Sequence, residues 1–358
     1  MGFHSIVSFL VSFVTALMIL PWLLKKCYQH NIFDSKSERK VHKNNVPRLG
    51  GVAFVPAMIF GMIVGLVFLQ AKDGNGLQYI RTTTFIVGGG TVLIYLVGII
   101  DDLWGMTARV KFFVQLLIAV SFPLCWLRIN SLYGFCGIYA LSYWTSFALT
   151  AFVVLLIINA VNLIDGIDGL AASLSIVALG IFGWHFSRAC SLPVFMIFIA
   201  SLMGALLAFL PYNLFGTTEK CTKTFMGDSG SLMLGAVLSY FTIKYCMDNP
   251  NTLLPHRDDG MIVAISALLI PCFDLCRVAL CRLVRGKGIF HADKTHLHHK
   301  FMAKGFSMHK TLIIIVLLQL AFYGINMLLF NLDLRIDVIL LVDVILYTLL
   351  NLWLPVEK

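Results

Sequence analysis

Two adjacent carboxylates, Asp101 and Asp102, directly follow an apolar run that ends at Ile100, and Lys111 lies nine residues after Asp102. Adjacent acids at the end of an apolar segment are costly unless they bind cations. The alternative is a solvated helix end, but acids after a helix C-terminus oppose the helix dipole. Neighbouring helical side chains point about 100° apart, so we expect the two carboxylates to have different roles.

A second acidic set lies in the segment 159–169, NAVNLIDGIDG. Asn162 and Asp165 are three positions apart, as are Asp165 and Asp168, so on a helix each pair shares a face. A polar helix cap explains one such residue, but not two carboxylates and two amides within ten residues. This segment therefore also favours a functional site.

The segment 225–231, FMGDSGS, places Asp228 directly before a long apolar run, and Asn213 ends the preceding Pro-Tyr-Asn. Asp228 has two interpretations. It is either a helix N-cap or a ligand for a hard cation beside backbone amides that face phosphate. The sequence alone leaves both open.

Basic residues accompany these acids. Lys43 and Arg48 precede a Gly-Gly pair in KNNVPRLGG, where the backbone can approach a ligand closely. Binding of lipid headgroups explains this loop equally well. The segment 291–300, HADKTHLHHK, adds a group of four histidines: His291, His296, His298 and His299. Such clusters are typical of zinc sites, but no cysteine or acidic triad stands at a metal-ligand spacing, so anion binding is favoured.

Carboxylate and amide oxygens are ligands that Mg²⁺ accepts together with substrate phosphates. The nearby cations indicate an anionic substrate, and the combination is typical of phosphoryl transfer. The sequence contains no Walker A, HExxH or EF-hand motif.

The elements that must position these residues are apolar. Of the 358 residues, 59% are hydrophobic and 13% are charged, whereas soluble chains carry about 25% charged residues. The composition favours one membrane domain over residues 1–358. A net charge of +9 could indicate nucleic acid, but the positions of the basic residues in loops account for it, so we expect no nucleic-acid partner.

A membrane-spanning helix needs about 20 mostly apolar residues. The sequence predicts an all-α integral membrane protein with about eleven transmembrane helices, at residues 3–24, 52–71, 84–100, 110–127, 143–161, 170–187, 191–210, 229–246, 261–280, 311–330 and 336–354.

The distribution of Lys and Arg predicts the orientation. Loops after odd-numbered spans, together with the C-terminus, hold 20 of the 27 basic residues, and the opposite loops hold six. Cytoplasmic loops carry the excess of Lys and Arg. We therefore expect the five polar segments to be cytoplasmic and the N-terminus to be periplasmic.

A transporter is the rival class of protein, because Asp337 and Asp343 lie within the last predicted span and buried charges often mark ion paths. Both residues lie outside every motif, and pairing with a neighbouring helix explains them. Transporters also bind substrate near the membrane midplane, whereas the polar groups here lie at one face.

Five motifs in this order, PRLGG, DD, NAVNLIDGIDGLA, FMGDSGS and HLHH, resemble the polyprenyl-phosphate N-acetylhexosamine-1-phosphate transferases. The resemblance extends from about residue 39 to residue 301. PRLGG and the His-x-His-His form are similar to the branch that uses UDP-N-acetylglucosamine and undecaprenyl phosphate. The branch that uses UDP-N-acetylmuramoyl-pentapeptide usually has three consecutive histidines.

The resemblance implies that a lipid phosphate attacks the β-phosphorus of a UDP-sugar, which yields UMP and a lipid-diphosphate sugar. We expect UDP-N-acetylglucosamine as the donor and undecaprenyl phosphate as the acceptor, in the first step of cell-surface polysaccharide synthesis. UDP-N-acetylmuramoyl-pentapeptide and other UDP-N-acetylhexosamines are alternative donors. Mg²⁺, or Mn²⁺ in its place, is the implied cofactor. The implied location is the bacterial inner membrane, and the oligomeric state stays open, with a homodimer as one option.

The resemblance also implies roles for individual residues. Those matching the metal ligands are Asp228 and Asn162. Those matching catalytic groups are Asp101, Asp102, Asp165 and Lys111. Asp101 is the usual candidate to deprotonate the lipid phosphate, and we expect Asp102 to act through Mg²⁺ or Lys111. Those matching substrate-binding positions are Lys43, Arg48, Asn162, Asp168, Asn213, His296, His298 and His299.

Overall fold

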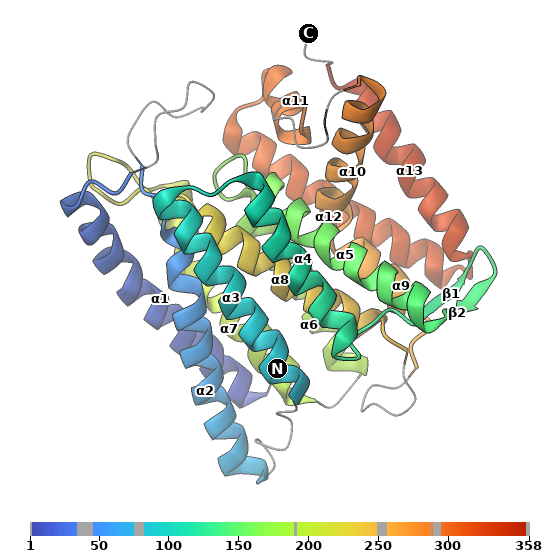
Figure 1. Cartoon of the computed structure of the whole chain (residues 1–358), viewed down its shortest axis with the longest axis horizontal. Helices are drawn as coiled ribbons and strands as arrows, with labels where there is room; N and C mark the ends of the chain where they lie inside the picture. Colours follow the sequence, from blue (N-terminus) through green and yellow to red (C-terminus); the bar gives the residue numbers. More distant parts are fainter. Residues whose placement is uncertain are drawn as a thin grey trace. The chain divides into compact units, whose positions relative to one another are not determined.

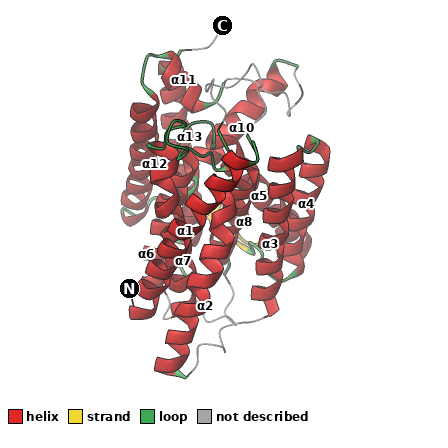
Figure 2. Ribbon diagram, turned by 90° about the vertical axis from the view of Figure 1, so that its left-hand side faces the viewer, coloured by secondary structure: helices red, strands yellow, loops and turns green. Residues whose placement is uncertain are grey.

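The computed structural model describes residues 2–33, 46–74, 82–189, 192–248, 256–286, 288 and 295–355. Within these ranges the regular structure is helical apart from one two-stranded hairpin, as Figure 2 shows. The chain divides into two compact units, each described here by itself. The first comprises Met1–Ile118 and Gly183–Leu234, and the second comprises Ala119–Phe182 and Gly235–Lys358.

The first unit contains the N-terminal helices and a helix from the middle of the chain (Figure 1). Its elements are α1 (Phe3–Gln29), η1 (Gly50–Ala53), α2 (Phe54–Asp73), α3 (Thr82–Trp104), the start of α4 (Ala108–Leu124), α7 (Pro193–Leu214) and the start of α8 (Gly227–Cys246). Small residues let α1 pack closely on α2 and α7. The hydroxyl of Ser8 donates to the carbonyl of Gly61 at 2.9 Å and lies 2.8 Å from the hydroxyl of Ser201.

The second unit contains the hairpin and the C-terminal helices. Its elements are β1 (Ser131–Phe135), β2 (Ile138–Ala140), α5 (Tyr143–Ile164), most of α6 (Leu170–Ala189), α9 (Gly260–Ala267), α10 (Leu269–Val284), α11 (Leu297–Ala303), α12 (Met308–Asn331) and α13 (Ile336–Trp353), with the remainders of α4 and α8.

Eight described helices are long and apolar enough to cross a membrane, and the bent pair α9 and α10 raises this number to nine. The chain is therefore a multi-pass membrane protein, but the predicted eleven spans are not confirmed. Helix α4 has only 17 residues, about 25 Å against a hydrocarbon core of about 30 Å. Helix α8 begins with the polar Gly-Asp-Ser-Gly-Ser and carries Lys244 in its last turn.

The bend between α9 and α10 is 71°, and a side chain of α12 supports it. Gln319 accepts a hydrogen bond from the backbone N–H of Ile270 at 3.0 Å and donates to the carbonyl of Ser266. A bend leaves helical backbone groups without their usual partners, and such groups must be satisfied inside a membrane. Gln319 supplies both partners, so the bend is a built feature of the fold.

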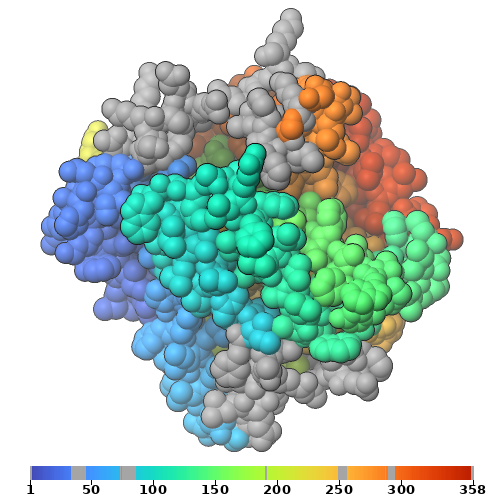
Figure 3. Space-filling model, viewed as in Figure 1, coloured from blue at the N-terminus to red at the C-terminus, as the bar shows by residue number. Residues whose placement is uncertain are grey.

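Apolar side chains remain exposed along the helices, as a lipid environment permits. Helix α3 exposes Leu93, Leu96 and Ile100, and its teal surface faces the viewer in Figure 3. Soluble proteins rarely expose apolar patches of this kind over a large area.

Candidate active site

Three predicted site residues meet in the first unit, around one cation. Asp101 lies near the end of α3, Lys111 in the first turn of α4 and Asp228 in the first turn of α8. The Lys111 Nζ forms an ion pair with Asp101 Oδ2 and lies 3.0 Å from Asp228 Oδ2. Two carboxylates thus converge on a single ammonium group.

The surroundings keep Lys111 charged. Burial alone would lower the pKa of its ammonium, but the carboxylates of Asp228 and Asp101 raise this pKa above its usual value. The second oxygen of Asp101, Oδ1, accepts the backbone N–H of Met106 at 2.6 Å, which fixes the carboxylate at the helix end. The cluster therefore offers a fixed pair of acidic oxygens and a permanent positive charge.

Asp102 points to a different partner from its neighbour. Its two oxygens accept the backbone N–H groups of Asp228 at 2.8 Å and Ser229 at 2.9 Å. These are among the first amides of α8, which have no partner within their own helix. Asp102 therefore caps α8, and our expectation that it would face Lys111 is wrong, because the contact with Lys111 belongs to Asp101. A contact between Asp102 and a metal ion stays a prediction.

This capping also resolves the two interpretations of Asp228. Helix α8 begins at Gly227, and the side chain of Asp228 contacts Lys111. Since Asp102 supplies the capping acceptor, the N-cap interpretation of Asp228 is wrong. The backbone amides of Asp228 and Ser229 are also occupied, so these two do not face phosphate.

Two glycines make the close approach of α3 and α8 possible. A Cβ atom added at Gly98 would lie 2.4 Å from the Cα of Ser229. A Cβ at Gly227 would lie 2.6 Å from Asp102 Oδ2, and the backbone there has a φ of +76° that L side chains rarely adopt. Gly227 of FMGDSGS and Gly98 of α3 are thus explained by packing around the cap.

The PRLGG loop runs alongside the FMGD segment in the same unit. The N–H of Phe225 donates to the carbonyl of Pro47 at 2.9 Å, and that of Gly51 donates to the carbonyl of Met226 at 2.8 Å. A Cβ at Gly227 would lie 2.0 Å from the carbonyl oxygen of Arg48. The loop therefore holds Arg48 close to the acidic cluster through its backbone, while Lys43 lies outside the described residues.

Asn213 supports the segment that leads into this cluster. Its side-chain amide donates to the carbonyl of Thr224 at 2.8 Å, and Lys223 donates to the Asn213 carbonyl oxygen. Asn213 is buried. The structure thus gives Asn213 a supporting contact, and a nucleotide contact stays a prediction.

In the second unit, the NLIDGIDG loop packs against the histidine helix α11. A Cβ at Gly166 would lie 2.2 Å from His298 Nε2. Asp165 is the residue at the C-terminal end of α5, and Asp168 is buried before α6. The structure therefore brings the Asp165–Asp168 loop and His298 together, with Asn162 one turn earlier on α5.

The three described histidines of this motif lie together, and His298 is the innermost of them. Its ring centroid lies 5.9 Å from that of His296 and 4.2 Å from that of His299. Burial, with smaller effects of His299 and His296, lowers the pKa of His298 to about 3. His298 is therefore neutral near pH 7. His291 and Lys294 lie outside the described residues.

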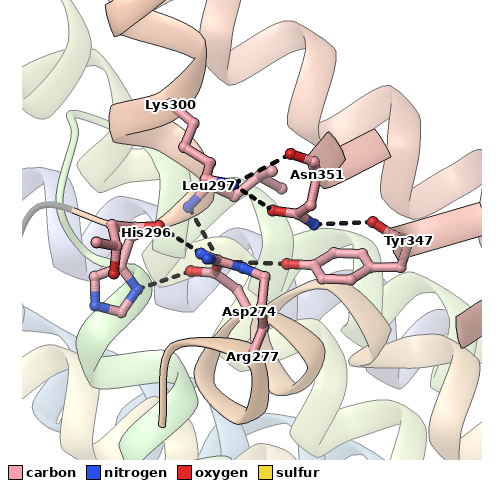
Figure 4. Close-up of polar contacts among 8 residues, drawn as sticks. Asp274, Arg277, His296, Leu297, Lys300, Tyr347 and Asn351 are labelled. Atoms are coloured by element: carbon pink, nitrogen blue, oxygen red, sulfur yellow. Dashed lines mark hydrogen bonds and ion pairs between the residues drawn. The ribbon is translucent and has the colours of Figure 1, made fainter. Parts of the chain in front are cut away.

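The sequence analysis missed one acidic residue, Asp274 of α10, which binds His296. The Nδ1 of His296 lies 2.8 Å from Asp274 Oδ2 (Figure 4). Asp274 lies inside the predicted span 261–280, where an ionisable residue is itself a signal of function. That signal was available, but no motif accompanied it.

The described residues contain no group of three or more His, Cys, Asp or Glu side chains that could hold a metal ion. A zinc site formed by the histidines is therefore not supported within the described ranges. Mg²⁺ needs fewer protein ligands, because one or two carboxylates and substrate phosphates suffice. Asp228 already contacts one cation, the Lys111 ammonium, so it fits Mg²⁺ together with substrate phosphates, and a role of Asn162 as a further ligand stays a prediction.

The two acids proposed for an ion path have ordinary partners. Asp343 accepts a hydrogen bond from Asn326 of α12 at 2.9 Å, which confirms pairing with a neighbouring helix. Asp337 pairs with Arg335 at 2.9 Å at the start of α13.

Comparisons with known proteins indicate one family. Residues 84–246 match glycosyl transferase family 4. A Bacillus subtilis protein named "Probable undecaprenyl-phosphate N-acetylglucosaminyl 1-phosphate transferase" is 30% identical over 88% of this chain and 82% of its own length. A Mycobacterium tuberculosis decaprenyl-phosphate N-acetylglucosaminephosphotransferase is 31% identical over 78% of this chain and 71% of its own. A Staphylococcus epidermidis phospho-N-acetylmuramoyl-pentapeptide-transferase is 27% identical over 84% and 91% respectively.

Proposed function

Because the chain belongs to the polyprenyl-phosphate N-acetylhexosamine-1-phosphate transferases of glycosyl transferase family 4, we propose that it transfers N-acetylglucosamine 1-phosphate from UDP-N-acetylglucosamine to undecaprenyl phosphate. The products are UMP and a lipid-diphosphate sugar. The observation that carries the proposal is the convergence of Asp101 and Asp228 on the Lys111 ammonium. Such a cluster suits a reaction between two phosphate groups.

In this reaction an oxygen of the lipid phosphate forms a bond to the β-phosphorus of the UDP-sugar. The bond from that phosphorus to the bridging oxygen breaks, and UMP leaves with the bridging oxygen. Phosphoryl transfer depends mainly on positioning and on neutralisation of negative charge. Lys111 supplies a permanent positive charge for a phosphate, and Asp101 holds Lys111 in place.

Asp228 would hold Mg²⁺, which when bound neutralises charge on the phosphates. Asp102 contributes by holding the first turn of α8, and with it Asp228, through two backbone amides. Asp101 then remains the candidate that deprotonates the lipid phosphate. It is less than 10% exposed, so few water molecules compete for its oxygens.

The histidine motif and the Asp165–Asp168 loop would bind the donor. The neutral His298 and its neighbours His296 and His299 suit the sugar and pyrophosphate, since imidazole both donates and accepts hydrogen bonds. Asp168 is proposed for the nucleotide and Asp165 as a further essential acid. The packing of His298 against Gly166 supports a common role for the two motifs.

The proposed location is the bacterial inner membrane, with a periplasmic N-terminus and a cytoplasmic active site. The 20 to six distribution of basic residues supports it. Cysteines placed singly at positions 43, 73 and 294 of a variant that lacks the nine native cysteines test this orientation. Labelling from outside intact cells should modify only position 73, and modification of 43 or 294 instead would contradict it.

A panel of radiolabelled UDP-sugars with undecaprenyl phosphate in detergent tests the proposed reaction. UDP-N-acetylglucosamine should place label in the lipid extract with equimolar release of UMP. Label from UDP-N-acetylmuramoyl-pentapeptide alone would favour the second candidate, which the S. epidermidis relative supports. Absence of UMP release with every donor would overturn the function.

A further inference from the structure

The carboxylate of Asp274 joins three helices of the second unit and contacts a predicted donor-binding residue. Its Oδ2 accepts the Nδ1 proton of His296 at 2.8 Å (Figure 4). Its Oδ1 accepts from the backbone N–H of Leu297 at 3.0 Å, from Arg277 at 2.8 Å and from the hydroxyl of Tyr347 at 3.2 Å. Asp274 is only 1% exposed, so water does not compete for these contacts.

The contacts divide unequally between the two oxygens. Among the described residues, three donors bind Oδ1 and His296 is the one that binds Oδ2. A carboxylate only accepts, so Nδ1 of His296 carries a proton whether the ring is neutral or charged. The opposite nitrogen, Nε2, is then an acceptor in the neutral ring and a donor in the charged ring.

The same carboxylate fixes the backbone as well as the ring. His296 is the N-cap residue of α11, with φ −61° and ψ 155°, and Leu297 is the first helical residue. Binding to both the His296 ring and the Leu297 amide holds the imidazole at two points. The ring therefore has a defined direction and a defined tautomer.

Resting on the proposed function, we propose that Asp274 is a positioning residue of the transfer reaction. It holds His296 with Nδ1 protonated, so that Nε2 either accepts from a sugar hydroxyl of the nucleotide-sugar donor when the ring is neutral or donates to a pyrophosphate oxygen when the ring is charged. Partners that orient an imidazole in this way affect activity nearly as strongly as the imidazole itself.

The last helix, α13, braces this arrangement from the other side. Tyr347 reaches Asp274, and Asn351 donates to the Tyr347 carbonyl at 2.9 Å. Lys300 of α11 donates to the side-chain and backbone oxygens of Asn351, both at 3.3 Å (Figure 4). Tyr347 therefore offers a matched control, because Tyr347→Phe weakens the same hub and leaves the His296 contact intact.

Asp274→Asn changes which ring nitrogen of His296 carries the proton, and it leaves the size of the side chain at position 274 unchanged. The amide oxygen of Asn would occupy the position of Oδ1, where it accepts from the three donors, and the NH₂ group of Asn would face His296. Nδ1 must then accept, so the proton moves to Nε2 in the neutral ring. We expect kcat for UMP release to fall by about 10–100-fold, with little change in KM for undecaprenyl phosphate. Tyr347→Phe should leave kcat near the wild-type value.

A double-mutant comparison separates this role from simple packing. If Asp274 acts through His296, Asp274→Asn/His296→Ala should be no slower than His296→Ala alone. Multiplicative losses would overturn the inference, as would equal losses of kcat in Asp274→Asn and Tyr347→Phe at similar thermal stability. A wild-type protein that releases no UMP would overturn the proposed function, and this inference with it.

Arg277 loses its charged partner in Asp274→Asn, which threatens folding. If that variant is not recovered from membranes, Asp274→Asn/Arg277→Gln, compared with Arg277→Gln, removes both charges of the ion pair. Asp274→Asn/Arg277→Gln should have a lower kcat than Arg277→Gln. This difference should vanish when both variants also carry His296→Ala. Persistence of the difference in the presence of His296→Ala would contradict the inference.

Discussion

Replacing Asp102 by Asn tests whether this carboxylate holds the N-terminus of α8 or acts as a base. The wild-type oxygens accept one backbone amide each, at 2.8 and 2.9 Å. Asn keeps one acceptor and turns an N–H group toward the other amide. A hydrogen bond to a charged group contributes about 1.5–3 kcal/mol, and a charge at a helix N-terminus contributes about 0.3–1 kcal/mol. The variant should therefore lose roughly 2–4 kcal/mol of the interaction that positions Asp228.

Each 1.4 kcal/mol is a factor of about ten in an equilibrium constant, so the aligned start of α8 should be less populated by roughly 10–10³-fold. We expect kcat for UMP release to fall by up to this factor. The loss should not recover as the pH rises from about 6 to 9, because capping requires an acceptor and no titrating base.

Asp101→Asn is the matched control, because it alters the adjacent carboxylate. A lipid phosphate has a second pKa of about 6, so it needs a base less as the pH rises. Asp101→Asn should then be slowest at low pH and partly recover at high pH. The measurement is kcat against pH for both variants, corrected for the folded fraction. Recovery of Asp102→Asn at high pH would refute its assignment as a cap, and a uniform loss in Asp101→Asn would argue against its role as base.

Three further variants test the packing and electrostatics of the two units. Gly98→Ala places a Cβ 2.4 Å from the Ser229 backbone and should cost about 1–3 kcal/mol in thermal unfolding, whereas Gly89→Ala on the same helix, with nothing within 4 Å, should be neutral. Lys111→Met should lower kcat by about 10²-fold or more at every pH up to about 9, because the raised pKa keeps the wild-type ammonium charged throughout; a loss confined to one end of the pH range would contradict this. The pKa of His298, lowered to about 3, lies below the unfolded value of about 6.5, so its contribution to stability is lost as the pH falls through that interval. Tm of His298→Gln should consequently decline less than that of the wild type over the same interval, and equal slopes would argue against a buried neutral imidazole.

The sequence predicted the acidic cluster because its members interrupt apolar runs. Asp101, Lys111 and Asp228 each stand at the end or start of such a run, and the structure brings them together. The division of labour between Asp101 and Asp102 was not predictable, because it depends on where α8 begins relative to α3. That relation is set by tertiary contacts such as the packing of Gly98 against Ser229.

The number of spans and the role of Asp274 also could not be predicted from the sequence pattern. Helices α9 and α10 read as one apolar run, but Gln319, more than 40 residues away, stabilises a bend of 71° between them. Asp274 lies in the same run, and its partner His296 is 22 residues further along the chain. Periodicity reports contacts within an element, whereas these features depend on side chains from other helices.

The most direct test of the account is UMP release by the purified protein and by Asp228→Ala, with UDP-N-acetylglucosamine, undecaprenyl phosphate and either Mg²⁺ or excess chelator. The wild type should turn over with Mg²⁺, stop reversibly in chelator and resume when Mg²⁺ is restored. Asp228→Ala should unfold at a similar temperature and release no UMP above background. Full wild-type activity in chelator, or a folded Asp228→Ala variant with wild-type turnover, would contradict the account.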